Sequence, residues 1–146
     1  MRLSQSELTA LLPHTGAMCL LDGVLDWDET RIVALATSHR RPDHPLRRDE
    51  GLSALCGVEY AGQAVAIHGS LLAGPPNGPA KPGYLASIRE LELAVDRLDE
   101  IESDLVIRAE IRHGNETGLL YAFSVESMES NDGPLLLGRI SVFLPG

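Results

Sequence analysis

Residues 53–73 read SALCGVEYAGQAVAIHGSLLA, and this stretch decides the fold. If it forms a helix, nearly every side of that helix is apolar or small, and such a helix belongs in the interior of a protein. Its glycines and alanines would allow the helix backbone to approach a sheet closely. We therefore expect one buried central helix over residues 53–73, with a single carboxylate, Glu59, in its first half.

The segments before this helix predict a short helix and a hairpin. Residues 4–12 fit a helix in which Ser4 is the N-cap and Glu7, three residues later, completes a capping box. Pro13 would end this helix, because proline lacks the amide that would continue it. Two short β-type segments joined by a turn then predict two strands, at residues 17–25 and 31–37.

A long loop is expected between the hairpin and the central helix. Residues 38–52 contain two prolines, four arginines and two histidines, and they show no hydrophobic periodicity. Loops of this length are uncommon in compact domains and are usually functional or mobile. Its basic side chains are Arg40, Arg41, Arg47 and Arg48. Either they are simply solvated or they attract an acidic partner.

A run of meandering strands is expected after the central helix. Apolar residues alternate with polar ones in these segments, which is typical of half-buried strands. The expected strands are residues 84–95, 104–112, 119–128 and 135–144. The fold class is therefore α+β, with one antiparallel sheet wrapped around one long apolar helix in a single domain of 146 residues. The sequence has neither G-x-G-x-x-G nor a P-loop, so a doubly wound fold is not expected.

Composition excludes several classes of function. The net charge of -9 argues against nucleic acid as a partner, because phosphate binding needs a basic surface. No apolar run approaches the ~18 residues of a membrane helix and no secretory signal is visible, so we expect a cytoplasmic protein. Cys19 and Cys56 lie in apolar runs without a C-x-x-C spacing, which predicts two reduced, buried thiols and neither a metal site nor a cofactor motif.

Glu59 is the first candidate for a functional residue. Burying a carboxylate without partners is costly, so a carboxylate in an apolar helix normally has a partner or a function. Gln63 lies four residues later on the same stripe of the helix and would hydrogen-bond either Glu59 or a ligand. The structural alternative is that Glu59 pairs with an arginine or faces a solvated gap.

Histidine is the natural base to oppose this carboxylate. His44 lies on the long loop, fifteen residues before Glu59, and is one candidate. His68 is nine residues after Glu59, about half a turn around the helix, so we expect it to face away and to be structural. Three histidines remain. His39 lies in the long loop, and His14 follows Pro13. His113 ends a predicted strand, where it should be exposed.

The start of the central helix is a further candidate for binding. The first amides of a helix lack partners within it, so those of residues 54–57 are expected to be free to polarise a carbonyl oxygen. A narrow apolar space beside them would suit an acyl chain.

The sequence resembles the β-hydroxyacyl-acyl-carrier-protein dehydratases of the hot-dog superfamily, and especially the branch associated with aryl-polyene gene clusters. LLPH at residues 11–14, followed by MCLLDGV at 18–24, is similar to the opening motif of the family. VEYAGQA at 58–64 resembles its central-helix motif, and His44 precedes the glutamate at nearly the family's spacing. The order of elements also agrees, so the resemblance covers essentially the whole chain.

The resemblance implies a hot-dog fold and a dimer, with a loop histidine and the helix carboxylate facing each other across the dimer interface. It implies that His44 removes the C2 proton of a 3-hydroxyacyl thioester, while Glu59 assists the hydroxyl to leave as water. An amide near Gly57 would hold the thioester oxygen, and Gln63 and His14 would also lie at the substrate-binding site. If His44 points away, His14 is the alternative base. The substrate would be an acyl carrier protein or coenzyme A thioester, in fatty acid or polyene-type biosynthesis.

Two other functions stay open. A hot-dog thioesterase would need Glu59 and a water but not His44. A non-catalytic acyl-binding subunit would keep the pocket and need neither residue. The loop after His44 keeps this alternative open, because it lacks the Pro-Gly pair that the family usually has before its helix.

Overall fold

The structure is a computed structural model of the chain, and it describes residues 2–11, 18–73, 84–129 and 132–143. These residues form two α-helices, two 3-10 turns and six strands. In chain order they are α1 (Gln5–Thr9), β1 (Gly23–Trp27), β2 (Arg31–Ala36), η2 (Ser38–Arg40), η3 (Ala54–Cys56), α2 (Gly57–Ala73), β3 (Tyr84–Leu93), β4 (Leu105–Gly114), β5 (Gly118–Ser127) and β6 (Leu136–Phe143).

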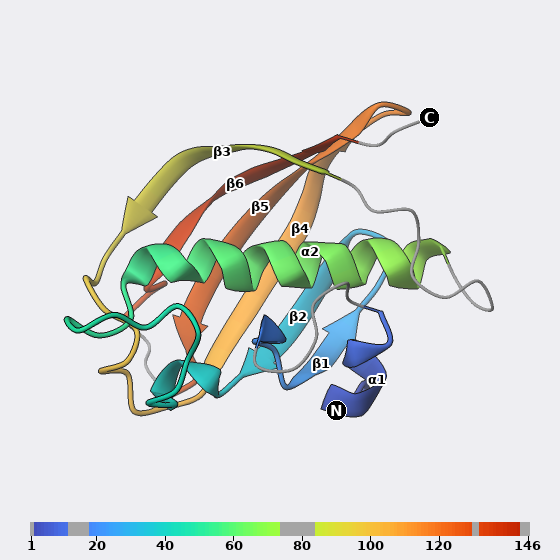
Figure 1. The fold of residues 1–146 in the computed structure, drawn as a ribbon. Helices are drawn as coiled ribbons and strands as arrows, with labels where there is room; N and C mark the ends of the chain where they lie inside the picture. Colours follow the sequence, from blue (N-terminus) through green and yellow to red (C-terminus); the bar gives the residue numbers. More distant parts are fainter. Residues whose placement is uncertain (1, 12–17, 74–83, 130–131, 144–146) are drawn as a thin grey trace.

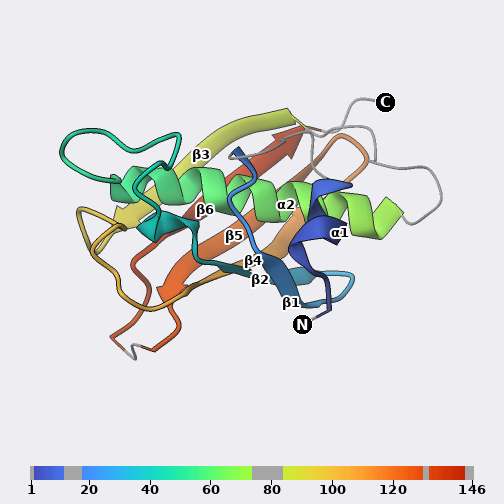
Figure 2. The ribbon, with the colours of Figure 1, turned by 60° about the horizontal axis from the view of Figure 1, so that its bottom comes forward.

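The strands form one antiparallel sheet in the order β1-β2-β4-β5-β6-β3. α2 lies across the inner face of this curved sheet (Figure 1), which confirms the predicted α+β arrangement of one sheet wrapped around one long helix. The expected meander is wrong for β3. This strand lies at the sheet edge beside β6, while β4 pairs with β2. Residues 94–104, which join β3 to β4, therefore cross the end of the sheet instead of forming a hairpin (Figure 2).

The first turn of α2 packs closely against the sheet at Gly57. Ser53 is the N-cap of the η3 turn, and its hydroxyl accepts the Leu55 N–H at 3.2 Å. A Cβ on Gly57 would lie 2.7 Å from both terminal methyl groups of Leu136, so this glycine permits a close approach to β6. Gly62 and Gly69 meet no such neighbour. The expectation that the internal glycines serve tight packing is therefore confirmed at Gly57 and wrong at Gly62 and Gly69.

One side of α2 remains uncovered by the sheet. Its members recur three and four residues apart, which places them on one stripe of the helix. They are half-buried or exposed in this single chain, and they are Glu59, Gly62, Ala66 and Gly69. We call them the open stripe of α2. The other side of the helix is buried against β2, β4 and β5.

The predicted alternation of β4 and β5 is confirmed. Their inward side chains are buried in one core beneath α2, and each fully buried aliphatic side chain stabilises the fold by roughly 1.5–3 kcal/mol. Those with the lowest exposure are Leu105, Ile107, Ala109, Tyr121, Phe123 and Val125. The outward side carries charged pairs such as Arg108 with Glu126, whose Nε and Oε2 atoms lie 3.2 Å apart.

The N-terminal segment differs in part from its prediction. The capping box of Ser4 and Glu7 is confirmed, although α1 ends at Thr9. The strand expected at residues 17–25 is β1, which begins at Gly23 and continues through Trp27. Asp26 was expected in the turn because of its charge, but its carboxylate pairs across the hairpin with Arg31 at 2.6 Å, and that pairing keeps it in the strand.

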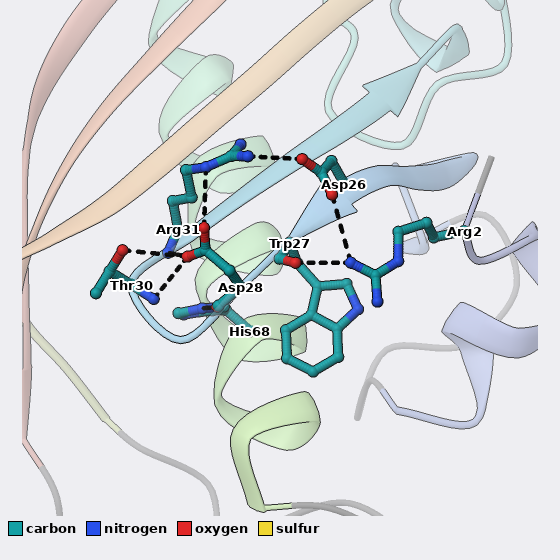
Figure 3. Close-up of polar contacts among 7 residues, drawn as sticks. All are labelled: Arg2, Asp26, Trp27, Asp28, Thr30, Arg31 and His68. Carbon is teal, nitrogen blue, oxygen red and sulfur yellow. Dashed lines mark hydrogen bonds and ion pairs between the residues drawn. The ribbon is translucent and has the colours of Figure 1, made fainter.

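Arg2 fastens the chain before α1 to the outer edge of β1. Its guanidinium donates to the Trp27 carbonyl at 2.7 Å and lies 5.1 Å from the centre of the Trp27 ring (Figure 3). The backbone of Leu3 exchanges hydrogen bonds with Val24 of β1. This edge of the sheet is therefore covered by the protein itself.

His68 joins the second half of α2 to the β1–β2 turn and to β5. Its Nε2 lies 2.7 Å from the Asp28 carbonyl oxygen and its Nδ1 lies 2.6 Å from the Tyr121 hydroxyl. Because a carbonyl can only accept, Nε2–H donates to Asp28 and Nδ1 accepts from Tyr121. The Asp28 carboxylate accepts the amides of Thr30 and Arg31 in the same turn, below which His68 lies (Figure 3). The expected structural role of His68 is confirmed.

Because burial lowers the pKa of His68, the fold should lose stability in mild acid. The folded-state pKa lies below the unfolded value of about 6.5, so this stabilisation is complete above that pH and is lost as the pH falls. Between pH 6.5 and 5.5, His68 should lower the free energy of unfolding by at most about 1 kcal/mol. Urea unfolding of wild type and His68→Gln at both pH values measures this, because the difference between the two proteins should shrink by that amount. A difference that does not change with pH would contradict it.

Within the described segments, no helix has both the length and the hydropathy that crossing a membrane requires.

Candidate functional site

The loop before α2 brings His44 onto the helix. The imidazole is 4% exposed, and its ring stacks on that of Tyr60 with the ring centres 6.1 Å apart. Nε2 lies 3.0 Å from the Tyr60 hydroxyl, and Nδ1 accepts the Leu46 N–H at 3.0 Å. His44 is therefore held at both nitrogens, one by the helix and one by its own loop.

Tyr60 continues this contact into the body of the protein. Its side chain is fully buried, and its hydroxyl lies 2.7 Å from the Ser38 hydroxyl. Ser38 donates in turn to the Leu20 carbonyl at 2.7 Å. A chain of three hydrogen bonds thus runs from His44 through Tyr60 and Ser38 to the backbone of Leu20.

The direction of each hydrogen bond in this chain follows from its ends. The Leu20 carbonyl only accepts, so the one proton of the Ser38 hydroxyl is directed at it. Tyr60 must then donate to Ser38, and His44 must donate from Nε2 to Tyr60. Nδ1 accepts an amide, which agrees, because a neutral imidazole has one donor and one acceptor nitrogen. The chain is satisfied only by a neutral His44 that carries its proton on Nε2.

The surroundings keep these groups uncharged. Burial is the main cause that lowers the pKa of His44, and the nearby charges of Arg41 and Arg47 lower it further, against the opposing effect of Asp43. Burial also raises the pKa of Tyr60 to about 12. At neutral pH, the site therefore contains an uncharged imidazole and an uncharged phenol.

Glu59 precedes Tyr60 on α2 and lies half-buried on the open stripe. Gln63 donates from Nε2 to Glu59 at 3.3 Å and to the Met18 carbonyl at 2.7 Å, and its Oε1 accepts the Leu20 N–H at 2.9 Å. The predicted hydrogen bond from Gln63 to Glu59 is confirmed. Since Gln63 is 1% exposed and bonded at both ends, it positions Glu59 instead of presenting a free amide to a ligand.

His44 therefore contacts the turn of α2 that carries Glu59. The imidazole contacts Tyr60, and Glu59 is the residue before it, about 100° around the helix axis. Cys56 lies one turn earlier on the side of Glu59, where burial raises the pKa of its thiol. The start of α2 therefore carries Glu59, and the residue after it, Tyr60, contacts His44.

The amides expected to be free at the start of α2 are all engaged. The Ala54 N–H donates to the Asp96 carbonyl, and those of Leu55 and Cys56 donate to Ser53. The Gly57 N–H donates back into the η3 turn. The expectation of free amides over residues 54–57 is therefore wrong, because the Ser53 cap and a 3-10 turn satisfy them, and we assign Gly57 a packing role.

Asp99 anchors the loop between His44 and α2. Its side chain is 5% exposed, and it accepts the Leu52 N–H at 2.9 Å and two hydrogen bonds from Arg97 at 2.6 and 3.1 Å. These donors, with the charge of Arg97, hold the pKa of Asp99 well below its usual range. Gly51 has φ +107°, which favours glycine, and lies against the same pair of side chains.

The other end of the loop is fixed by His39 and Arg40. Nε2 of the buried His39 lies 3.0 Å from the carbonyl oxygens of both Ile101 and Ser103, so it carries a proton and donates to them. The Arg40 guanidinium donates to the Glu102 carbonyl at 2.6 Å. The long loop predicted at residues 38–52 is therefore tightly attached, which is what holding His44 in place requires.

The remaining candidates have other places. His14 lies outside the described residues. His113 is exposed at the end of β4, as expected. Cys19 is buried and Cys56 half-buried, and both are free thiols. Among the described residues, no group of three or more histidine, cysteine, aspartate or glutamate side chains is arranged to hold a metal ion.

Sequence reasoning missed Tyr60 and Ser38. A signal for Tyr60 was present, because a tyrosine in an apolar helix needs a partner for its hydroxyl when it is buried. Nothing in the sequence distinguished Ser38 from other loop serines, since its role depends on contacts with residues 18 and 22 positions away.

A curved antiparallel sheet wrapped around one long helix is the architecture of the hot-dog fold. The chain belongs to the ApeP-like family, described as ApeP dehydratase, whose model matches residues 6–146. It is therefore a dehydratase-type lyase, and the predicted hot-dog fold is confirmed.

Solved structures of the same fold include both dehydratases and thioesterases. One is the dehydratase heterocomplex ApeI:P from Xenorhabdus doucetiae, with 19% identity and a TM-score of 0.78 over 95% of this chain and 91% of that one. Another is a putative thioesterase from Silicibacter sp. TM1040, with 13% identity and a TM-score of 0.68 over 100% and 94%. Zebra fish thioesterase superfamily member 2 has 13% identity and a TM-score of 0.66 over 97% and 95%. A search of curated proteins gave no match.

Proposed function

We propose that this protein removes water from a 3-hydroxyacyl thioester to give the trans-2-enoyl thioester, with His44 as base and Glu59 as acid. The observation that supports this proposal most is that the loop holds His44 against Tyr60, the residue that follows Glu59 on α2. In a dimer, His44 of one chain would act with Glu59 of the other, as the resemblance implies. The chain's membership of a dehydratase family supports the reaction class.

The two residues divide the proton transfers between them. His44 takes the proton from C2, and the electron pair of that bond forms the C2–C3 double bond. The C3–O bond breaks, and Glu59 gives the proton that lets the hydroxyl leave as water. A neutral imidazole suits the first step, because burial and neighbouring cations lower the pKa of His44.

The acyl group is proposed to arrive on an acyl carrier protein, with coenzyme A as the alternative carrier. The basic side chains of the long loop lie beside the candidate site and would suit an acidic carrier or the phosphate of its phosphopantetheine. Arg40 and Arg47 are also paired with Asp104 and Asp99, while Arg48 is exposed. Arg48 is thus the side chain in this run best placed to meet a carrier.

We propose that the active form is a dimer. Two features of this chain support a second hot-dog chain beside it: the open stripe of α2, and the outer edge of β3, which pairs with no other strand among the described residues. A second copy of this chain is our proposal. A related hot-dog chain is the alternative, since ApeI:P is named as a heterocomplex.

A second candidate function is hydrolysis of the thioester by Glu59 and a water. Two thioesterases among the solved structures of this fold support it. At 13% sequence identity, each of them shares the fold with this chain and not necessarily the reaction. This reaction would release a free thiol and would not need His44.

Turnover of a 3-hydroxyacyl thioester on acyl carrier protein tests the proposal, with enoyl product and free thiol followed in parallel in wild type and His44→Ala. We expect enoyl product from wild type and a loss of roughly 10²–10⁴-fold in the variant, the usual contribution of a general base. His113→Ala is the matched control, because that histidine is exposed on β4. Free thiol that survives His44→Ala would establish the thioesterase, and no product of either kind would favour an acyl-binding subunit.

A further inference from the structure

The hydrogen bonds around His44 decide which of its nitrogens can act on a substrate. We propose that Tyr60 is a positioning residue that holds the Nε2–H of His44, and that Nδ1 is therefore the nitrogen that takes the substrate proton. This inference rests on the proposed role of His44 as base and adds to it the nitrogen used and the group that fixes it.

The first step is that Nε2 cannot be the base. It lies 3.0 Å from the Tyr60 hydroxyl, whose own proton is committed to Ser38 at 2.7 Å. Ser38 is committed in turn to the Leu20 carbonyl. Nε2 therefore keeps its proton as long as this chain exists, and Nδ1 carries the free electron pair.

The second step is that Tyr60 is a rigid acceptor. Its side chain is fully buried, and its hydroxyl lies between the His44 ring and the Ser38 hydroxyl. When Nδ1 takes a proton, the imidazole becomes an imidazolium, and a hydrogen bond from a charged donor is stronger than one from a neutral donor. The phenol thus stabilises the charged product of proton removal without accepting the proton itself. This is how an orienting group supports a catalytic histidine.

The third step concerns the cover over Nδ1. The Leu46 N–H donates to it at 3.0 Å, and the imidazole is 4% exposed. The thioester must therefore displace this amide as it binds, which requires a local shift of the loop after His44. The charged and titratable groups that face the ring are Arg41, Arg47, Asp43, His39 and, from α2, Tyr60.

The proton balance of the step is complete with these residues. The C2–H bond breaks and its proton moves to Nδ1, while its electron pair forms the C2–C3 double bond. The hydroxyl leaves as water with the proton of Glu59. Nε2 keeps its proton throughout, and after release of the product the Nδ1 proton returns to Glu59 or to solvent.

Tyr60→Phe removes the acceptor and keeps the ring. We expect kcat for dehydration to fall roughly 10- to 100-fold, with KM changed little, because the imidazole loses its orientation. The acid limb of the kcat/KM profile should move to lower pH by about 0.7 of a unit, because the imidazolium loses a charge-assisted hydrogen bond. Tyr121→Phe is the matched control: it removes the same hydroxyl from the other buried tyrosine–histidine pair and should leave both readouts unchanged.

Nitrogen-15 NMR of His44 in the free wild-type protein tests the inference without any substrate. We expect a protonated Nε2 and an unprotonated Nδ1 at neutral pH. The opposite tautomer would overturn the inference, and so would a Tyr60→Phe variant that keeps the wild-type rate and pH profile. If Tyr60→Phe does not fold, Ser38→Ala removes the next hydrogen bond and should shift both readouts in the same direction by less.

The activities of His44→Ala and Tyr60→Phe distinguish an error in the proposed function from an error in this inference. If His44→Ala keeps full dehydratase activity, the role of His44 as base is wrong, whatever the NMR shows. If His44→Ala is inactive while Tyr60→Phe behaves as wild type, the base is correct and the positioning role of Tyr60 is wrong.

Discussion

Replacing Glu59 with glutamine is expected to lower kcat for dehydration by roughly 10²–10⁴-fold, the usual contribution of a general acid. Glutamine has nearly the same shape and still accepts the hydrogen bond from Gln63, so the side chain should keep its place on α2. What it loses is the proton that the leaving hydroxyl needs. Steady-state formation of the enoyl thioester measures the effect.

The matched control for this change lies on the opposite face of the sheet. Glu126→Gln also neutralises a glutamate that is partly exposed and hydrogen-bonded, since Glu126 pairs with Arg108 and accepts from Ser124. We expect this variant to keep the wild-type rate. A Glu59→Gln variant that retains more than about a tenth of the wild-type kcat would remove Glu59 from the role of acid.

Asp99→Asn is expected to have the largest effect on stability. The carboxylate is 5% exposed and accepts the Leu52 N–H and two donors from Arg97, and an amide at this place would turn a donor toward the guanidinium. The loss should be about 2 kcal/mol, within the range for lost hydrogen bonds to a charged group, because the Arg97 side chain is 41% exposed and can return to water. In a chain of this size the midpoint of thermal unfolding should fall by roughly 4–8 °C, which calorimetry or circular dichroism measures.

An exposed ion pair provides the comparison for Asp99. Glu110 pairs with Arg112 at 3.2 Å, but their side chains are 46% and 58% exposed. Pairs of this kind contribute little, so Glu110→Gln should change the free energy of unfolding by less than about 0.5 kcal/mol. If the two substitutions lower the free energy of unfolding equally, Asp99 stabilises the fold no more than an exposed ion pair does.

Much of the fold was predictable because its signals are local. The apolar run of residues 53–73 specified the central helix, and the alternation of residues 104–112 specified a half-buried strand. The capping box of Ser4 and the hydrogen bond between Gln63 and Glu59 depend on residues three and four positions apart. Patterns of this length can be read directly from a sequence.

Features that depend on distant residues could not be predicted in the same way. The position of β3 beside β6 is set by the sheet as a whole, since its neighbours come from the far end of the chain. The amides of residues 54–57 were expected to be free, but the Ala54 N–H donates to the Asp96 carbonyl. No local pattern connects these two residues, so the sequence could not show this hydrogen bond. His44 could be chosen by resemblance, but its attachment to Tyr60 required the folded loop.

The backbone of Leu20 has a consequence for how the candidate site moves. Its carbonyl ends the hydrogen-bond chain from His44, and its amide holds the Gln63 side chain that positions Glu59. The hydrogen bonds that position the two proposed partners in proton transfer thus both end on the backbone of one residue, although one partner lies on a loop and the other on a helix. A displacement of Leu20 would therefore disturb the supports of both side chains together.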